Sequence, residues 1–135
     1  MTRDDAKALV ARYFEEVWNA ADPVALDELT TPDFSYTIGG QAGRDRAGMR
    51  AFLATMRTAF PDWRVRVVDA IAEGETVAVR WNGEVTHRGD FHGIAPTGKR
   101  VAVSGMNFYR LLGGKIAAEW EQTDSLGLLR QLGVG

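Results

Sequence analysis

Apolar residues between Asp4 and Asn19 recur every three or four positions, the spacing that places side chains along one face of a helix. Thr2, with Asp5 three residues later, can accept the first free amides of such a helix and favour the positive end of its dipole. The pattern therefore predicts a helix from Asp4 to Asn19. Its apolar positions are Ala6, Leu9, Val10, Tyr13, Phe14, Val17 and Trp18.

Two shorter helices and a strand are predicted next. Asp22 followed by Pro23 is typical of an N-cap and a first helical residue, which indicates a short helix over Val24–Leu29. Phe34–Ile38 has the character of a short strand. A third helix is predicted to end before Pro61. Its apolar positions are Met49, Phe52, Leu53, Met56 and Phe60.

After Pro61 the period changes from helical to alternating, which indicates strands. Turns at Glu73-Gly74 and Gly113-Gly114 divide this region, and the second turn joins predicted strands at Val101–Leu111 and Lys115–Asp124. A leucine-rich segment, Ser125–Leu132, follows. Helices followed by strands predict one α+β domain over residues 1–135, in which a curved antiparallel sheet wraps around the N-terminal helices as a cone with a pocket.

Composition narrows the possible functions. The 135 residues are 45% apolar, enough for one core, and 16 basic against 18 acidic residues give a formal charge of -2 with no basic run. Nucleic acid is therefore an unexpected partner. The absence of cysteine excludes disulfides and thiolate chemistry, and two histidines are too few for a zinc site, so we expect no metal or cofactor. No basic start with an apolar region and no membrane-length apolar run is present, so we expect a cytoplasmic protein without membrane contact.

Four stretches in order along the chain resemble the SnoaL-like polyketide cyclases, a branch of the nuclear-transport-factor-2-like superfamily. They are Pro32-Asp33-Phe34, Phe91–Gly98, Gly114-Lys115-Ile116 and Trp120–Gly133. The resemblance implies a cone-shaped fold that encloses an apolar pocket. It also implies a cofactor-free cyclase that closes a ring of a small hydrophobic, polyketide-type substrate by an intramolecular aldol reaction. The family also includes hydroxylation components and proteins of no known activity.

Asp124 matches the acid/base aspartate of that family. A two-residue turn at Gly113-Gly114 would place it on the same face as Trp120, Gln122 and Asn107. One carboxyl in a dry pocket can remove a carbon-bound proton and later protonate the alkoxide. The alternative is that Asp124 only caps the helix of the C-terminal segment.

Two further residues are catalytic candidates. Arg80 could orient Asp124 or stabilise an oxyanion if its side chain enters the pocket, and otherwise it is a solvated arginine on the outer face. His87, after Thr86, resembles a threonine-histidine pair of the family and could protonate a substrate oxygen, whereas the alternative is an exposed turn histidine. Many relatives have a histidine where this chain has Thr37, so the resemblance implies no second acid/base group at that position.

The predicted pocket wall combines apolar and polar residues. Trp18 and Tyr36 each bring a polar edge to an apolar face. The remaining apolar candidates could equally belong to the core. The full set of predicted substrate contacts is Trp18, Tyr36, Phe52, Met56, Asn107, Trp120 and Gln122.

Besides a hydroxylation component of the same fold, three other functions remain as alternatives. An epoxide hydrolase of the limonene type needs an arginine and an aspartate two residues apart on one strand, but the pair here is Arg80 and Asn82, and an amide cannot activate water. A steroid isomerase would need a carboxylate such as Asp69, which lies close to a turn. The third is a small-molecule binding module without catalysis.

The strand Val77–Asn82 bears on assembly. If Arg80 faces the pocket, then Val77, Val79 and Trp81 face outward and form an apolar patch that predicts a sheet-to-sheet homodimer. If the faces are inverted, both that reason for a dimer and the role of Arg80 are lost.

Overall fold

The computed structural model describes residues 1–134, whose elements follow the predicted order of helices and then strands. In chain order they are α1 (Arg3–Tyr13), the π-helical turn η1 (Phe14–Asn19), α2 (Pro23–Leu29), β1 (Thr30–Ile38), α3 (Arg46–Ala59), β2 (Arg66–Glu73), β3 (Thr76–Thr86), β4 (Arg100–Leu112), β5 (Lys115–Thr123) and α4 (Ser125–Gln131).

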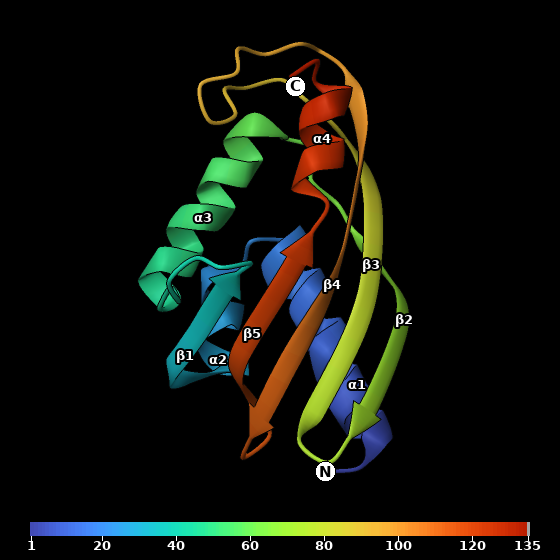
Figure 1. Ribbon diagram of the computed structural model, residues 1–135. Helices are drawn as coiled ribbons and strands as arrows, with labels where there is room; N and C mark the ends of the chain where they lie inside the picture. The colour runs from blue at the N-terminus through green and yellow to red at the C-terminus, as the bar shows by residue number, and fades with distance from the viewer. Residues whose placement is uncertain (135) are drawn as a thin grey trace.

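The strands form one curved sheet in the order β1-β5-β4-β3-β2. From β2 to β5 the strands make the predicted antiparallel meander, whereas β1 pairs in parallel with β5 at the edge. The sheet bends around α1, and α3 and α4 lie at the end where the chain terminates (Figure 1). The predicted α+β class and the curved sheet around N-terminal helices are therefore confirmed.

The first helix begins as predicted and changes its winding near its end. Thr2 and Asp5 form a complete capping box at the start of α1. From Phe14 onward the winding is π-helical, and the Ala20 amide donates to the carbonyl of Glu15, five residues earlier, at 3.0 Å. A π turn brings residues five apart onto one face, so Tyr13 and Trp18 both point into the sheet.

A β-bulge interrupts the hairpin between β4 and β5. Leu112 pairs with Lys115 as the two-residue turn requires, but Arg110 pairs with Ala118, which leaves Ala117 as an extra residue. Because side chains alternate along a strand, one extra residue reverses every face beyond it. The predicted register of β5 is therefore wrong: Asn107 lies opposite Glu121, not opposite Trp120.

The structure also decides the orientation of β3. Val77, Val79 and Trp81 are buried in the core, and Arg80 is exposed on the outer face, where it pairs with Asp69 at 2.5 Å. The inverted alternative is thus the observed one. Arg80 does not enter the pocket, and the patch from which we predicted the homodimer is part of the core.

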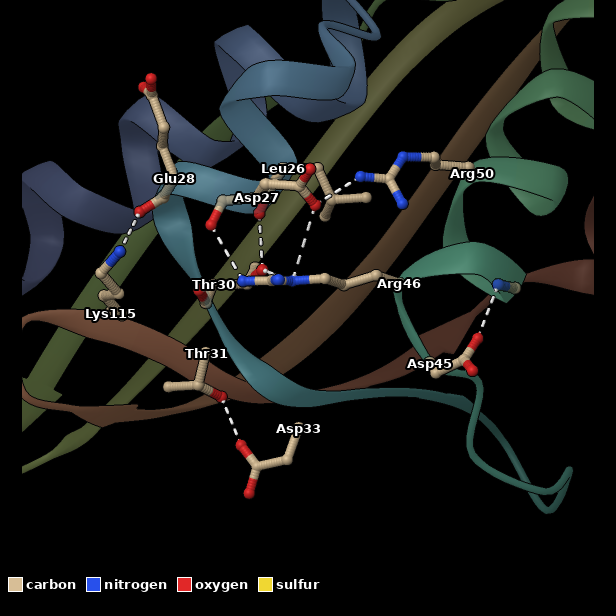
Figure 2. A network of polar contacts seen from close by, with 11 residues as sticks. Leu26, Asp27, Glu28, Thr30, Thr31, Asp33, Asp45, Arg46, Arg50 and Lys115 are labelled. Carbon is tan, nitrogen blue, oxygen red and sulfur yellow. Dashed lines mark hydrogen bonds and ion pairs between the residues drawn. The ribbon is translucent and has the colours of Figure 1, made fainter.

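A cluster of polar contacts ties α2, β1 and α3 together (Figure 2). Arg46 donates to the backbone carbonyls of Asp27 and Thr30 at 2.9 and 2.6 Å, and Arg50 pairs with the Asp27 carboxylate. Asp45 caps α3 by accepting from the Gly48 amide at 2.9 Å. These contacts fix the start of α3 beside β1, next to residues that line the pocket described below.

Candidate active site

A pocket of about 680 Å³ lies between α3, the sheet and α4. Aromatic rings and aliphatic side chains provide much of its wall, and several exposed polar residues also line it. A cavity of this size holds a small organic molecule. The aromatic residues are Trp18, Phe52, Trp63, Trp81 and Phe91, and the exposed polar ones are Gln41, Asp45, His92 and Ser125.

Glu121 of β5 presents a buried carboxyl group to this pocket. Its side chain is 4% exposed and lines the cavity. Its Oε1 accepts from the Tyr36 hydroxyl at 2.8 Å and from the Asn107 amide at 3.5 Å. Within residues 1–134 no protein group donates to Oε2. One oxygen is therefore held by the protein, and the other is free to meet a ligand.

Glu119, two residues earlier on β5, lies behind Glu121 and is fully buried. Tyr13 donates to its Oε1 at 2.6 Å, and Trp18 and Asn107 donate to its Oε2 at 3.0 and 3.1 Å. Tyr109 donates to Oε2 as well. Four donors leave this carboxyl group saturated, so its geometry suits a structural role better than proton exchange with a ligand.

Burial shifts both carboxyl groups toward the protonated form. It raises the pKa of Glu121 from 4.5 to about 7, and repulsion by Glu119 adds to the effect. Hydrogen bonds from Tyr36 and Asn107, with the positive charge of Arg44, act in the opposite direction. Burial also raises the pKa of Glu119, to about 6, against its hydrogen bonds. Near neutral pH Glu121 can therefore both accept and return a proton.

Asn107 of β4 connects this pair to Trp81 on the neighbouring strand β3. Its amide nitrogen donates to Glu119 and Glu121, and its Oδ1 accepts from the Trp81 indole at 2.9 Å. The network fixes the orientation of the Asn107 amide. If the amide were turned over, its NH₂ group would face the Trp81 indole N–H, and neither group could accept a hydrogen bond from the other. The orientation of Glu121 is thus set by several strands at once.

Five of the predicted wall residues lie at or behind this pocket. Phe52, Met56 and Trp18 line it. Tyr36 and Asn107 lie behind Glu121 as its hydrogen-bond donors. The structure therefore brings together the predicted contacts from the helices, β1 and β4. The predicted contacts from β5, Trp120 and Gln122, do not lie at the pocket.

Asp124 does not face the pocket. It is exposed, and its carboxyl group accepts from the Gly127 amide at 2.8 Å as the N-cap of α4. The predicted placement beside Trp120 in a dry pocket is wrong because the bulge at Ala117 reverses the faces of β5. The alternative given by the sequence, a capping aspartate, describes the observed geometry.

The other predicted residues also lie outside the pocket. Trp120 is 45% exposed on the outer face, and Gln122 is exposed beside it. Arg80 lies on that same outer face. His87 is fully buried, not an exposed turn residue, and its Nδ1 accepts from the Thr97 amide at 3.1 Å. It packs against Phe60 and does not line the cavity.

The sequence interpretation missed Glu119, Glu121 and Arg44. The two glutamates alternate with Trp120, so the strand pattern contains them, but period-two alternation alone does not say which set faces inward. A bulge in a hairpin has no clear residue signature here. Arg44 follows a glycine-rich turn, and only its pairing with Tyr36 shows that it returns to the site.

Comparison with known proteins agrees with this architecture. The chain belongs to the SnoaL-like polyketide cyclase family, whose model matches residues 8–132. The comparison with curated proteins gave no significant match.

Solved structures of similar fold include two from Streptomyces. AclR of Streptomyces galilaeus, a candidate hydroxylase, is 29% identical with a TM-score of 0.87, over 98% of this chain and 87% of AclR. IdmH of Streptomyces antibioticus, a candidate polyketide cyclase, is 30% identical with a TM-score of 0.84, over 96% of this chain and 99% of IdmH. A candidate SnoaL-like cyclase of Jannaschia sp. CCS1 is 25% identical with a TM-score of 0.90, over 98% and 94% of the two chains.

Among the helices described in residues 1–134, none is long and apolar enough to cross a membrane.

Proposed function

We propose that this protein is a cofactor-independent cyclase-type enzyme that acts on a small apolar, polyketide-type molecule, with Glu121 as its acid/base group. The observation that carries the proposal is a buried carboxyl group at the pocket with one oxygen held by Tyr36 and the other free. Membership of the SnoaL-like cyclase family supports the reaction class.

The proposed reaction is an intramolecular aldol closure. The free Oε2 of Glu121 removes a proton from a methylene group activated by neighbouring carbonyls. The resulting carbanion attacks a second carbonyl carbon, so a carbon–carbon bond forms while the carbonyl π pair moves to oxygen. Glu121 then returns its proton to that alkoxide. The cyclic product contains the same atoms as the substrate, so the reaction needs no added reactant, metal or cofactor.

A raised pKa suits both halves of this cycle. A carboxyl group with a pKa of about 7 is partly ionised at neutral pH. Its protonated form is a better proton donor to an alkoxide than water is. Glu121 is 4% exposed beside the aromatic wall, and this low exposure to water strengthens electrostatic interactions at its carboxyl group. Tyr36 keeps the carboxyl group in one orientation through both steps.

The alternatives differ in what supports them. The likeness to AclR, a candidate hydroxylase, supports a hydroxylation component as the second candidate. An epoxide hydrolase of the limonene type loses support, because Arg80 lies on the outer face with Asp69. A binding module without catalysis would use the same pocket but would not need a free, weakly acidic carboxyl group.

Proton exchange on a simple ketone tests the proposed base. In deuterated water, the wild-type protein is expected to accelerate exchange of the activated methylene protons of 2-tetralone, measured by proton NMR. Glu121→Gln should lower the rate by at least about a hundredfold, since general base catalysis contributes at least this much. Asp124→Asn is the matched control and should keep wild-type exchange. The opposite pattern, with loss only in Asp124→Asn, would return the role to Asp124.

We further propose that the chain forms a homodimer through the outer face of the sheet. Ile71, Ala78, Phe108 and Trp120 are successive cross-strand neighbours on β2, β3, β4 and β5. The three large side chains are 70%, 55% and 45% exposed. Such a row is an unusual surface for a monomer, and two copies related by a two-fold axis can cover it with the same residues.

Light scattering tests the proposed dimer. The wild-type protein is expected at twice its chain mass at micromolar concentration, and Phe108→Glu should give the monomer mass by placing charge in the apolar contact. Glu84→Gln, exposed on β3 away from this row, should remain dimeric. A wild-type monomer at these concentrations would contradict the proposal.

A further inference from the structure

Backbone pairing with Tyr36 holds Arg44 close to Glu121. Its amide donates to the Tyr36 carbonyl at 2.7 Å, and its carbonyl accepts from the Tyr36 amide at 2.8 Å. Residues opposite each other in an antiparallel pair project to the same face. Arg44 therefore lies beside Tyr36, the hydrogen-bond donor of Glu121. Its guanidinium lies over the Phe52 ring, 5.2 Å from the ring centre, and the residue lines the pocket.

Among the described residues, Arg44 forms no ion pair, although its charge acts on Glu121 from a longer distance. Within residues 1–134, no carboxylate lies within 4.0 Å of its guanidinium. Its only side-chain hydrogen bond there is from Nη2 to the neutral amide oxygen of Gln41, at 2.9 Å. The Nη1 atom is shielded from water and has no acceptor. The nearby Arg46 and Arg50, by contrast, both pair with Asp27 (Figure 2).

A second pocket residue also has an unused donor. Trp63 is 6% exposed and lines the cavity, and its indole Nε1 has no acceptor in the described part of the chain. Buried donors without acceptors are costly. Both atoms are closed to water, so a ligand oxygen in the pocket would reach either of them after a small shift of its side chain.

The two donors differ in what would satisfy them. A carbonyl oxygen suffices for the Trp63 indole, but a neutral oxygen leaves the Arg44 charge unbalanced. A carboxylate matches the planar guanidinium with two parallel hydrogen bonds and neutralises it. The aromatic wall around both donors favours an apolar, flat body in the same molecule.

We propose that the pocket binds aromatic or similarly flat apolar molecules that carry a carboxylate, and that Arg44 selects them by pairing with that group. This inference deepens the proposed function by naming its substrate class and rests on the same pocket, although it does not depend on proton transfer by Glu121. With the carboxylate at Arg44, the body of the molecule extends along Phe52 toward Glu121, where the reacting carbon would lie.

Calorimetric titration with a matched pair of probes tests the selection. 2-Naphthoate carries the carboxylate, and 2-naphthamide is its neutral counterpart of the same shape. At pH 6, where Glu121 with a pKa of about 7 is mostly protonated, the wild-type protein should bind the naphthoate at least about tenfold more tightly, as expected for a charge-assisted pair. Arg44→Gln should abolish that preference while it keeps the affinity for the naphthamide.

The control is Arg50→Gln, which changes another arginine next to this region that does not line the pocket. It should retain the wild-type preference. Equal affinity for the two probes in the wild type, binding of neither probe, or a preference that survives Arg44→Gln would each overturn the inference.

Glu121→Gln separates this inference from the proposed function. A variant that loses ketone exchange but keeps the carboxylate preference supports both. Lost exchange without any carboxylate preference in the wild type would overturn only the role of Arg44. A clear carboxylate preference with exchange unchanged in Glu121→Gln would overturn only the role of Glu121.

Discussion

Glu121→Gln is expected to stabilise the protein at pH 8 and to change its stability little at pH 5. Burial raises the pKa of Glu121 from 4.5 to about 7. Between these values the folded protein holds a proton that the unfolded chain releases, so its free energy of unfolding falls as the pH rises through them. For this shift the loss is about 3 kcal/mol at pH 8, and glutamine, which does not ionise, avoids it.

Urea denaturation at pH 5 and pH 8 measures this difference. The wild type should lose stability between the two pH values, and Glu121→Gln should lose clearly less, while the titration of Glu119 remains in both. Asp124→Asn should follow the wild type, since asparagine is an equally good helix cap. If Glu121→Gln and the wild type run in parallel from pH 5 to pH 8, the buried carboxyl group does not cost stability when it ionises.

Glu119→Leu is expected to destabilise the fold severely at every pH. The substitution removes the acceptor of four buried groups, from Tyr13, Trp18, Asn107 and Tyr109. Each buried donor left without a partner costs about 1–3 kcal/mol, and release of the buried charge offsets only part of the sum. We expect a net loss of at least about 3 kcal/mol in the free energy of unfolding.

The matched control for Glu119→Leu is Glu121→Leu, two residues along the same strand. That substitution leaves the Tyr36 hydroxyl without its acceptor next to a pocket, whereas Asn107 loses one long bond and keeps its bond to Glu119. It should cost clearly less by urea denaturation. Equal losses in the two variants would contradict the division into a structural Glu119 and a chemical Glu121.

Local patterns predicted the elements of this fold well, because they depend on short-range chemistry. The capping box at Thr2 and Asp5 and the turn at Gly113-Gly114 form where the residues indicate them. The helix over Val24–Leu29 was predicted from Asp22-Pro23, and the structure has both residues in those positions. The fold class followed from the order of these elements and from the family resemblance.

The inward face of β5 could not be predicted, because it depends on one extra residue. The bulge at Ala117 changes which alternate side chains of β5 face inward. Nothing in Lys115–Ala118 distinguishes a bulged hairpin from a regular one. Trp120 and Gln122 were therefore assigned to the pocket, and the alternate residues Glu119 and Glu121 were not considered. The orientation of β3 was left open for a similar reason, since Arg80 and Trp81 each had a plausible place on either face.

The π-helical turn at Phe14–Asn19 is a second feature that the sequence pattern does not reveal. Trp18 fits the predicted helical stripe equally well in either winding. Only the wider π-helical turn lets the Trp18 indole and the Tyr13 hydroxyl donate hydrogen bonds to the same carboxyl group, that of Glu119. Trp18 was thus correctly predicted at the pocket, while its hydrogen bond to the buried network was not.

The most direct test of the proposed chemistry is the pKa of Glu121 itself. Carbon-13 NMR of the glutamate side-chain carboxyl groups, titrated from pH 4 to pH 9 and assigned with Glu121→Gln, would resolve it. We expect a resonance that titrates near pH 7 in the wild type and is missing in the variant. A Glu121 resonance that titrates at its ordinary value of 4.5 would contradict the proposal, because the group would then hold no proton at neutral pH to return to an alkoxide.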